Sequence, residues 1–225
     1  MNRFLPLIAL LAAIAAGGAW VFSQQSESAV GLITPALAES EATDAGDILP
    51  DHVLGDPDAP VTLIEYASFT CGHCASFHKD QAKRLKEDYI DTGKVRFIHR
   101  EIYWDQFALR AGLLAACGGE MRYQGIAGLL YEQQRDWIGS GEPDEIIENL
   151  VTLGKVAGLT EEDARACIEL ENNDMVGKLI ATFQHHAEAD GIRATPTLVI
   201  NGEVHMNMDY DDLKALIDTK LAAAE

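Results

Sequence analysis

The stretch Val61–Cys74, with the sequence VTLIEYASFTCGHC, joins an extended apolar run to the start of a helix. Both faces of Val61–Ala67 are largely apolar, which is typical of a central strand covered on both sides; Glu65 is the exception. Thr70 can cap a helix that begins at Cys71, because apolar residues recur at helical spacing from there on. We therefore predict a buried strand, a short loop and a helix that starts at a cysteine.

The position of the two cysteines, Cys71 and Cys74, favours redox chemistry. Free N–H groups of a first helical turn and the helix dipole stabilise an anion at Cys71, and the thiolate is the reactive form of cysteine. Cys74 lies within bonding reach, so one sulfur can attack a partner while the other resolves the mixed disulfide. His73 can add a positive charge or an N–H to the thiolate, which makes the disulfide a stronger oxidant.

A purely structural disulfide and half of a zinc site are the alternatives for this pair. A zinc site needs two further ligands. His78 lies near, but no second Cys-x-x-Cys and no His-x₃-His follows. We predict a redox-active pair and no metal.

Strand and helix signals alternate around this stretch and then give way to helices. Lys94–Ile102 is predicted as a second strand, and the pattern is helical from Trp104 to about Asp190. A strand, an Asn-Gly turn, a return strand and a final helix follow, at Thr197–Ile200, Asn201-Gly202, Glu203–His205 and Asp209–Ala223. The order predicts an α/β sheet domain, residues 56–103 and 191–225, interrupted by a helical domain, residues 104–190.

The N-terminal segment is predicted to direct export. Leu5–Phe22 is almost wholly apolar and follows Arg3, and Ala36-Leu37-Ala38 has the form of a cleavage site. A cleaved export signal, residues 1–38, and an uncleaved N-terminal anchor both remain open. Residues 39–55 are predicted as a linker and N-terminal extension. Either alternative places the rest outside the cytoplasmic membrane, where disulfides persist.

The composition excludes other classes of protein. The 225 residues include 17 Lys and Arg against 36 Asp and Glu, which gives a net charge of −19. Such an acidic chain lacks the positive surface that nucleic-acid binding needs. Four cysteines are too few for a small scaffold held together by disulfides.

The stretch Glu65–Cys74, the helical insertion and the later dipeptide Thr195-Pro196 together resemble the DsbA-type disulfide oxidoreductases. The similarity covers about Asp51 to Ala223. It implies a thioredoxin-like fold with an inserted all-helical domain. It also implies that Cys71 is the nucleophile and Cys74 the resolving thiol.

The resemblance assigns further roles around the cysteines. Pro196 would be a cis-proline opposite them, presenting the backbone of Thr195 to a substrate strand and keeping metals off the thiols. Gly72, between the cysteines, is the third expected substrate contact. Glu65 matches a buried acid that lies beneath the thiols in this family, and a buried carboxyl can exchange protons with Cys74. Alternatively, Glu65 is paired with His99 or Arg100 and has no catalytic part.

The resemblance further implies the activity and the partners. The expected function is a periplasmic oxidase that introduces disulfides into reduced or unfolded exported proteins. The alternative is a reductase or isomerase for a narrow set of clients, since Gly-His between the cysteines also occurs in eukaryotic disulfide isomerases. No diffusible cofactor is expected, because the disulfide is itself the redox centre. A DsbB-like membrane partner would recycle it.

About 20 residues between the signal and Asp56 are too few for an isomerase dimerisation domain, so we expect a monomer.

Cys117 and Cys167 lie in the helical insertion, 50 residues apart. Unpaired thiols in an exported chain tend to oxidise, so we expect a structural disulfide between two helices. Some DsbA relatives have such a second bond. Two separate buried thiols and a second redox pair are the alternatives.

Overall fold

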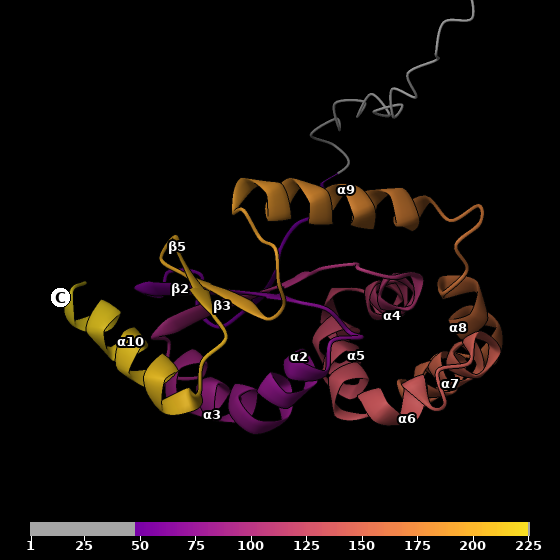
Figure 1. Ribbon diagram of the computed structural model, residues 1–225, viewed down its shortest axis with the longest axis horizontal. Coiled ribbons are helices and arrows are strands. Elements are labelled where there is room, and N and C mark those ends of the chain that lie inside the picture. The colour runs from indigo at the N-terminus through magenta and orange to yellow at the C-terminus, as the bar shows by residue number, and fades with distance from the viewer. Residues whose placement is uncertain (1–47, 225) are drawn as a thin grey trace, which may run out of the picture. The chain divides into compact units, whose positions relative to one another are not determined.

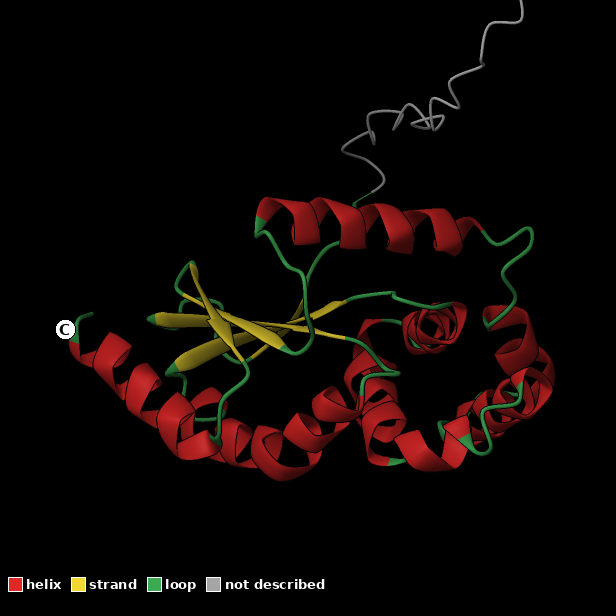
Figure 2. Ribbon diagram, viewed as in Figure 1, coloured by secondary structure: helices red, strands yellow, loops and turns green. Residues whose placement is uncertain are grey.

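A five-stranded mixed sheet lies at the centre of the fold (Figures 1 and 2). The structure is a computed structural model that describes residues 48–224. The predicted export signal or anchor, residues 1–38, lies outside these described residues, as does most of the predicted linker. Within residues 48–224, no helix combines the length and the apolar character needed to cross a membrane.

The strand order is β1-β3-β2-β4-β5, with only β2 and β3 parallel. The central position of β2 agrees with the prediction from its two apolar faces. The hairpin between β4 and β5 turns at Asn201-Gly202, where both residues have positive φ, 48° and 83°. The strand bounds are β1 His52–Leu54, β2 Val61–Ala67, β3 Val95–Glu101, β4 Thr197–Ile200 and β5 Glu203–Met206.

One face of the sheet is covered by the helical segment that follows β2 and by the C-terminal helix α10, Tyr210–Ala222. The segment comprises α2 (Gly72–Phe77), η3 (His78–Ala82), α3 (Lys83–Leu85) and η4 (Lys86–Ile90), so it includes two π-helical turns. Its buried side chains pack with those of α10 against the apolar residues of β2. The opposite face is covered by α9, Asp174–Ala189.

The insertion between β3 and β4 is helical, as predicted. Its core includes Trp137 and Leu150 and reaches Phe69 and Cys74. The insertion therefore forms part of the packing around the reactive cysteines. Besides α9 it contains α4 (Gln106–Cys117), α5 (Glu120–Glu132), α6 (Gln134–Ile138), α7 (Pro143–Val156) and α8 (Glu161–Cys167).

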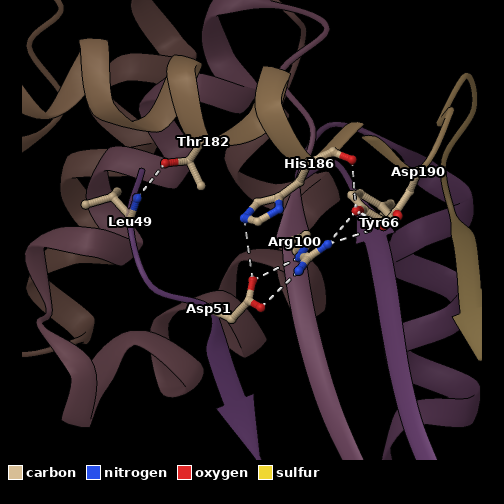
Figure 3. Close-up of polar contacts among 7 residues, drawn as sticks. All are labelled: Leu49, Asp51, Tyr66, Arg100, Thr182, His186 and Asp190. Carbon is tan, nitrogen blue, oxygen red and sulfur yellow. Dashed lines mark hydrogen bonds and ion pairs between the residues drawn. The ribbon is translucent and has the colours of Figure 1, made fainter. Parts of the chain in front are cut away.

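A network around Arg100 fastens α9 and the first described residues to the sheet (Figure 3). The guanidinium of Arg100 donates to both carboxylate oxygens of Asp51, at 2.9 and 3.0 Å, and to the hydroxyl of Tyr66 at 2.7 Å. Tyr66 in turn donates to Asp190, just after α9. Arg100 is thus engaged here and does not pair with Glu65, contrary to one of the two partners considered from the sequence.

Candidate active site

Cys71 lies at the N-cap of α2, with an extended backbone (φ −79°, ψ 116°). The prediction that Thr70 caps this helix is wrong, because the helix begins one residue later. The hydroxyl of Thr70 instead donates to Asp105 at 2.7 Å, and Asp105 is itself the N-cap of α4. The side chain of Cys71 makes no capping hydrogen bond, but the backbone N–H groups of His73 and Cys74 in the first turn of α2 help to lower the pKa of its thiol.

The two thiols differ sharply in their acidity. Both are free in this structure, Cys71 partly exposed and Cys74 fully buried. Hydrogen bonds from the side chain of Cys74, the side chain of Thr195 and the backbone N–H groups of Cys74 and His73 outweigh desolvation and lower the pKa of Cys71 to about 5. The hydrogen bond to Cys71, burial and the charge of Glu65 raise the pKa of Cys74. At neutral pH the reduced pair is a thiolate at Cys71 and a thiol at Cys74.

The fold brings Thr195 and Pro196 next to Cys71, more than 120 residues away in sequence. The sulfur of Cys71 lies 3.4 Å from the carbonyl oxygen of Thr195, and the Thr195–Pro196 peptide bond is cis. A Cβ built on Gly72 would meet no atom within 4 Å. The backbone of Thr195 thus borders the sulfur of Cys71, and the space around the neighbouring Gly72 is open.

His73 acts through its backbone in this geometry. The residue is exposed, and no hydrogen bond joins its side chain to Cys71 in the described part of the chain. Its backbone N–H is among the groups that lower the pKa of Cys71. The contribution expected from its imidazole is therefore not part of the described geometry.

Glu65 is fully buried on β2 and pairs with a residue that the sequence did not indicate. One carboxylate oxygen lies 2.8 Å from Nε2 of His78, while the other has no hydrogen-bond partner among the described residues. The ring of His78 stacks on Tyr131, with centroids 3.9 Å apart. His99, the other partner considered from the sequence, is instead held between the hydroxyls of Tyr131 and Tyr123.

Glu65, His78 and His99 place potential metal-ligand atoms within 4.8 Å of one another. Both ring nitrogens of His99 already contact tyrosine hydroxyls, and His78 already contacts Glu65. Binding a metal here would leave buried hydroxyls unpaired, which is unfavourable. The donor set fits a hydrogen-bond network better than a metal centre.

Gln134 is a second site residue that the sequence did not reveal. Its buried side-chain amide donates to the carbonyl oxygens of Phe69 at 2.7 Å and of Cys71 at 2.9 Å. It therefore ties the loop before α2 to the helical insertion. The available signal was a polar residue four positions after Leu130 and three before Trp137, on the buried face of the helical pattern.

The other two cysteines are joined to each other. Cys117 at the end of α4 and Cys167 at the end of α8 form a disulfide, with Cα atoms 6.0 Å apart. The bond lies within the helical insertion and links two of its helices.

Comparison with known proteins adds independent information. A family model described as Thioredoxin matches residues 48–219. A protein of Rickettsia bellii named "Putative protein-disulfide oxidoreductase" is 31% identical over 169 residues, which are 75% of this chain and 63% of that protein. The "Disulfide bond formation protein D" of Bacillus subtilis is 29% identical, over 75% of this chain and 76% of that protein. The chain spans about three-fifths of the length of its rickettsial relatives.

Solved structures agree with this relationship. The crystal structure of alpha-DsbA1 from Wolbachia pipientis has a TM-score of 0.70 and 27% identity, covering 78% of this chain and 94% of that one. The oxidised BdbD of Bacillus subtilis, at 24% identity and a TM-score of 0.66, has the same fold. Each of these proteins combines the sheet with helices in an arrangement similar to that of residues 48–224.

Proposed function

This chain belongs to the thioredoxin family, in its DsbA-type branch of protein-disulfide oxidoreductases, and we propose that it introduces disulfides into exported proteins through Cys71 and Cys74. The supporting observation is the unequal acidity of the two thiols. The pKa of Cys71 is lowered to about 5 at the N-cap of α2, while the pKa of the buried Cys74 is raised. Stabilising the Cys71 thiolate favours the reduced pair, so the disulfide is a strong oxidant.

The exchange proceeds in two displacements. A substrate thiolate attacks the sulfur of Cys71 in the Cys71–Cys74 disulfide, and Cys74 leaves with the electron pair and takes up a proton. A second substrate thiolate then attacks the substrate sulfur of the mixed disulfide, and Cys71 leaves as a stable thiolate. Two electrons pass from the substrate to the protein. Of the two protons that the substrate thiols lose, one ends on Cys74 and the other in solvent.

The neighbouring residues support these steps. We assign Gly72, Thr195 and Pro196 to substrate binding, because open space and an accessible backbone border Cys71 there. The backbone of His73 helps to stabilise the thiolate. Glu65, whose charge acts on Cys74, is assigned to proton exchange with that thiol.

The location, the oligomeric state, the domains and the partners of the chain are part of the same proposal. The chain acts in the periplasm as a monomer, after export by its N-terminal segment or anchored by it. Residues 56–103 and 191–225 form the catalytic domain and residues 104–190 the inserted domain, which Cys117–Cys167 stabilises. Reduced exported proteins are the substrates, and a membrane redox partner reoxidises Cys71 and Cys74 without a diffusible cofactor.

The test is oxidation of a reduced, unfolded secretory protein by the full-length chain, combined with a redox titration against glutathione. We expect stoichiometric disulfide transfer and a potential closer to about −120 mV than to about −270 mV, the values typical of DsbA and of thioredoxin. Cys71→Ser should abolish transfer, and Cys74→Ala should trap substrate on Cys71. The double variant Cys117→Ala/Cys167→Ala is the matched control and should retain transfer. A thioredoxin-like potential would contradict the oxidase and favour the reductase.

A further inference from the structure

A line of buried polar side chains leads away from the reactive thiols. The imidazole of His99 on β3 lies between two tyrosines of α5, with its Nε2 3.0 Å from the hydroxyl of Tyr131 and its Nδ1 3.0 Å from that of Tyr123. The hydroxyl of Tyr123 is 2.5 Å from the carboxylate of Glu101. Both tyrosines and the histidine are at most 3% exposed. Four groups able to pass a proton are thus connected in series.

The direction of these hydrogen bonds follows from the chemistry of the groups. An ionised carboxylate only accepts, so Tyr123 donates to Glu101 and must accept from His99 Nδ1. Burial lowers the pKa of His99, so the imidazole is neutral and its Nε2 accepts from Tyr131. Every donor therefore points toward Glu101. A proton that arrives at Tyr131 can be relayed by successive transfers until one is bound at Glu101.

The near end of the line lies at Glu65. A carboxylate oxygen of Glu65 and a ring nitrogen of His99 lie within 4.8 Å of one another, and the hydroxyl of Tyr131 lies 3.0 Å from Nε2 of that ring. The free oxygen of Glu65 is buried without a partner among the described residues. The charge of Glu65 also raises the pKa of both Cys74 and Tyr131. The charge of Glu65 thus acts on both the resolving thiol and the first hydroxyl of the line.

The far end opens into a cavity of about 40 Å³, which is large enough for water. Glu101 lines this cavity together with Tyr103, whose hydroxyl also donates to it. Burial raises the pKa of Glu101 to about 7, so the carboxyl can take up or release a proton near neutral pH. Three residues of the Arg100 network in Figure 3 also line this cavity: Asp51, Arg100 and His186.

We propose that Tyr131, His99, Tyr123 and Glu101 form a proton pathway that connects Cys74, through Glu65, with this cavity. The proposal deepens the proposed function and rests on it. When Cys74 attacks the mixed disulfide between Cys71 and the redox partner during reoxidation, its S–H bond breaks and the Cys71–Cys74 bond forms. The bond between Cys71 and the partner's sulfur breaks, and that sulfur leaves with the electron pair as a thiolate. The proton passes to Glu65, and relayed transfers along the line leave one proton on Glu101. All the hydrogen bonds then point the opposite way, ready to return a proton when Cys74 next leaves as a thiolate.

Other titratable groups face Glu101 and can modify its ionisation. Tyr103 follows β3, Tyr123 belongs to α5, and α4 contributes only a glycine at this point. The remaining titratable residues that line the cavity are Asp51, His52, His99, Arg100 and His186. Any pH profile assigned to Glu101 must therefore be compared with that of a Glu101 variant.

The test measures the step in which Cys74 attacks, by stopped-flow release of a chromogenic thiol from a mixed disulfide preformed at Cys71 of the full-length protein. Tyr123→Phe keeps the ring but interrupts the line, and Glu101→Gln removes its terminal acceptor. We expect each to slow the step about 10-fold at pH 8, a modest part of the usual effect of acid–base catalysis. The parent rate should show an inflection near pH 7 that Glu101→Gln lacks. A small buffer acid or base, imidazole, should restore part of the rate of the variants.

Control measurements separate the pathway from a loss of structure. Tyr66→Phe removes a buried hydroxyl from the Arg100 network on the same sheet and should keep the parent rate. The pKa of Cys71 should be unchanged in Tyr123→Phe and Glu101→Gln. Parent-like rates and pH profiles in both variants, with exchange intact, would overturn the pathway and leave the proposed function standing. Slowing of Tyr66→Phe to the same extent would also overturn it. No thiol exchange in the parent itself would overturn both.

Discussion

The carboxylate of Glu65 and the imidazole of His78 meet at 2.8 Å, between the central strand and the helical segment that carries the reactive cysteines. Glu65 is fully buried, and His78 lies two helical turns after Cys71. The contact holds an acidic group close enough to Cys74 for its charge to raise the pKa of that thiol. The pair therefore contributes both to the stability of the fold and to the acidity of the resolving thiol.

Replacing His78 should destabilise the protein. His78→Ala leaves the buried carboxylate of Glu65 without its hydrogen-bond partner, which typically costs about 1–3 kcal/mol. His73→Ala removes an exposed imidazole from the same segment and should change the free energy of unfolding by less than about 0.5 kcal/mol. Urea denaturation of the oxidised proteins measures both. Equal effects of the two substitutions would contradict the assigned contact.

The Cys71 thiol should titrate near pH 5. Thiolate absorbance at 240 nm should show this midpoint in the reduced protein, and Cys74→Ala should raise it because the largest stabilising hydrogen bond is lost. The pKa is lower than its unfolded value of about 8.5, so the thiolate stabilises the reduced fold fully above that pH. This contribution declines as the pH falls and is gone below about pH 5. The melting temperature of the reduced form, relative to the oxidised form, should therefore rise from pH 4 to pH 9. A midpoint near 8.5 would contradict the geometry.

The sequence predicted the parts of the fold that depend on local patterns. The alternation in Val61–Ala67 and the Asn201-Gly202 turn correspond to β2 and to the β4–β5 hairpin. The three-residue strand β1 was missed because it is too short to show a period. The helix α6 was missed because its five residues are too few to show a helical period.

For the candidate site, too, only the parts that depend on local sequence patterns could be predicted. The positions of Cys71 and Cys74 follow from sequence, because a helix start is a local signal. The partner of Glu65 does not, because several basic side chains follow it in the chain and only the tertiary packing selects His78. The two contacts of Gln134 join segments more than 60 residues apart, so no local pattern could reveal them.

Gln134 should determine how firmly the loop before α2 is held. Gln134→Leu keeps the volume but leaves the carbonyl oxygens of Phe69 and Cys71 without this donor, so we expect a loss of about 1–3 kcal/mol in the free energy of unfolding. Hydrogen exchange should increase at the loop residues. Gln133→Leu, at the half-buried neighbouring position, is the control and should leave loop exchange unchanged. Unaltered exchange in Gln134→Leu would show that the amide does not hold the loop.

Loss of the second disulfide should affect stability rather than redox potential. The bond closes a loop of about 50 residues, so removing it with Cys117→Ala/Cys167→Ala should cost about 4 kcal/mol by the loop-entropy relation. The potential of Cys71–Cys74 should not change, because the second bond joins α4 to α8, whereas the reactive pair lies at the start of α2. Denaturation without reductant and a glutathione titration give the two values. A shifted potential would indicate that the second bond participates in exchange.

Gly112 in the interior of α4 provides a test with an unusual sign. Replacing a helical glycine with alanine normally stabilises a protein by up to about 1 kcal/mol. A Cβ on Gly112, however, would lie 2.6 Å from both Glu101 Oε2 and the hydroxyl of Tyr103, so Gly112→Ala should destabilise by about 1–3 kcal/mol. Gly128→Ala on α5 meets no atom within 4 Å and should stabilise instead. Thermal unfolding of the two variants measures the difference, and stabilisation by Gly112→Ala would show that the Tyr103–Glu101 contact is not as close as described. Because the same substitution displaces Glu101, it should also slow the step in which Cys74 attacks, whereas Gly128→Ala should not.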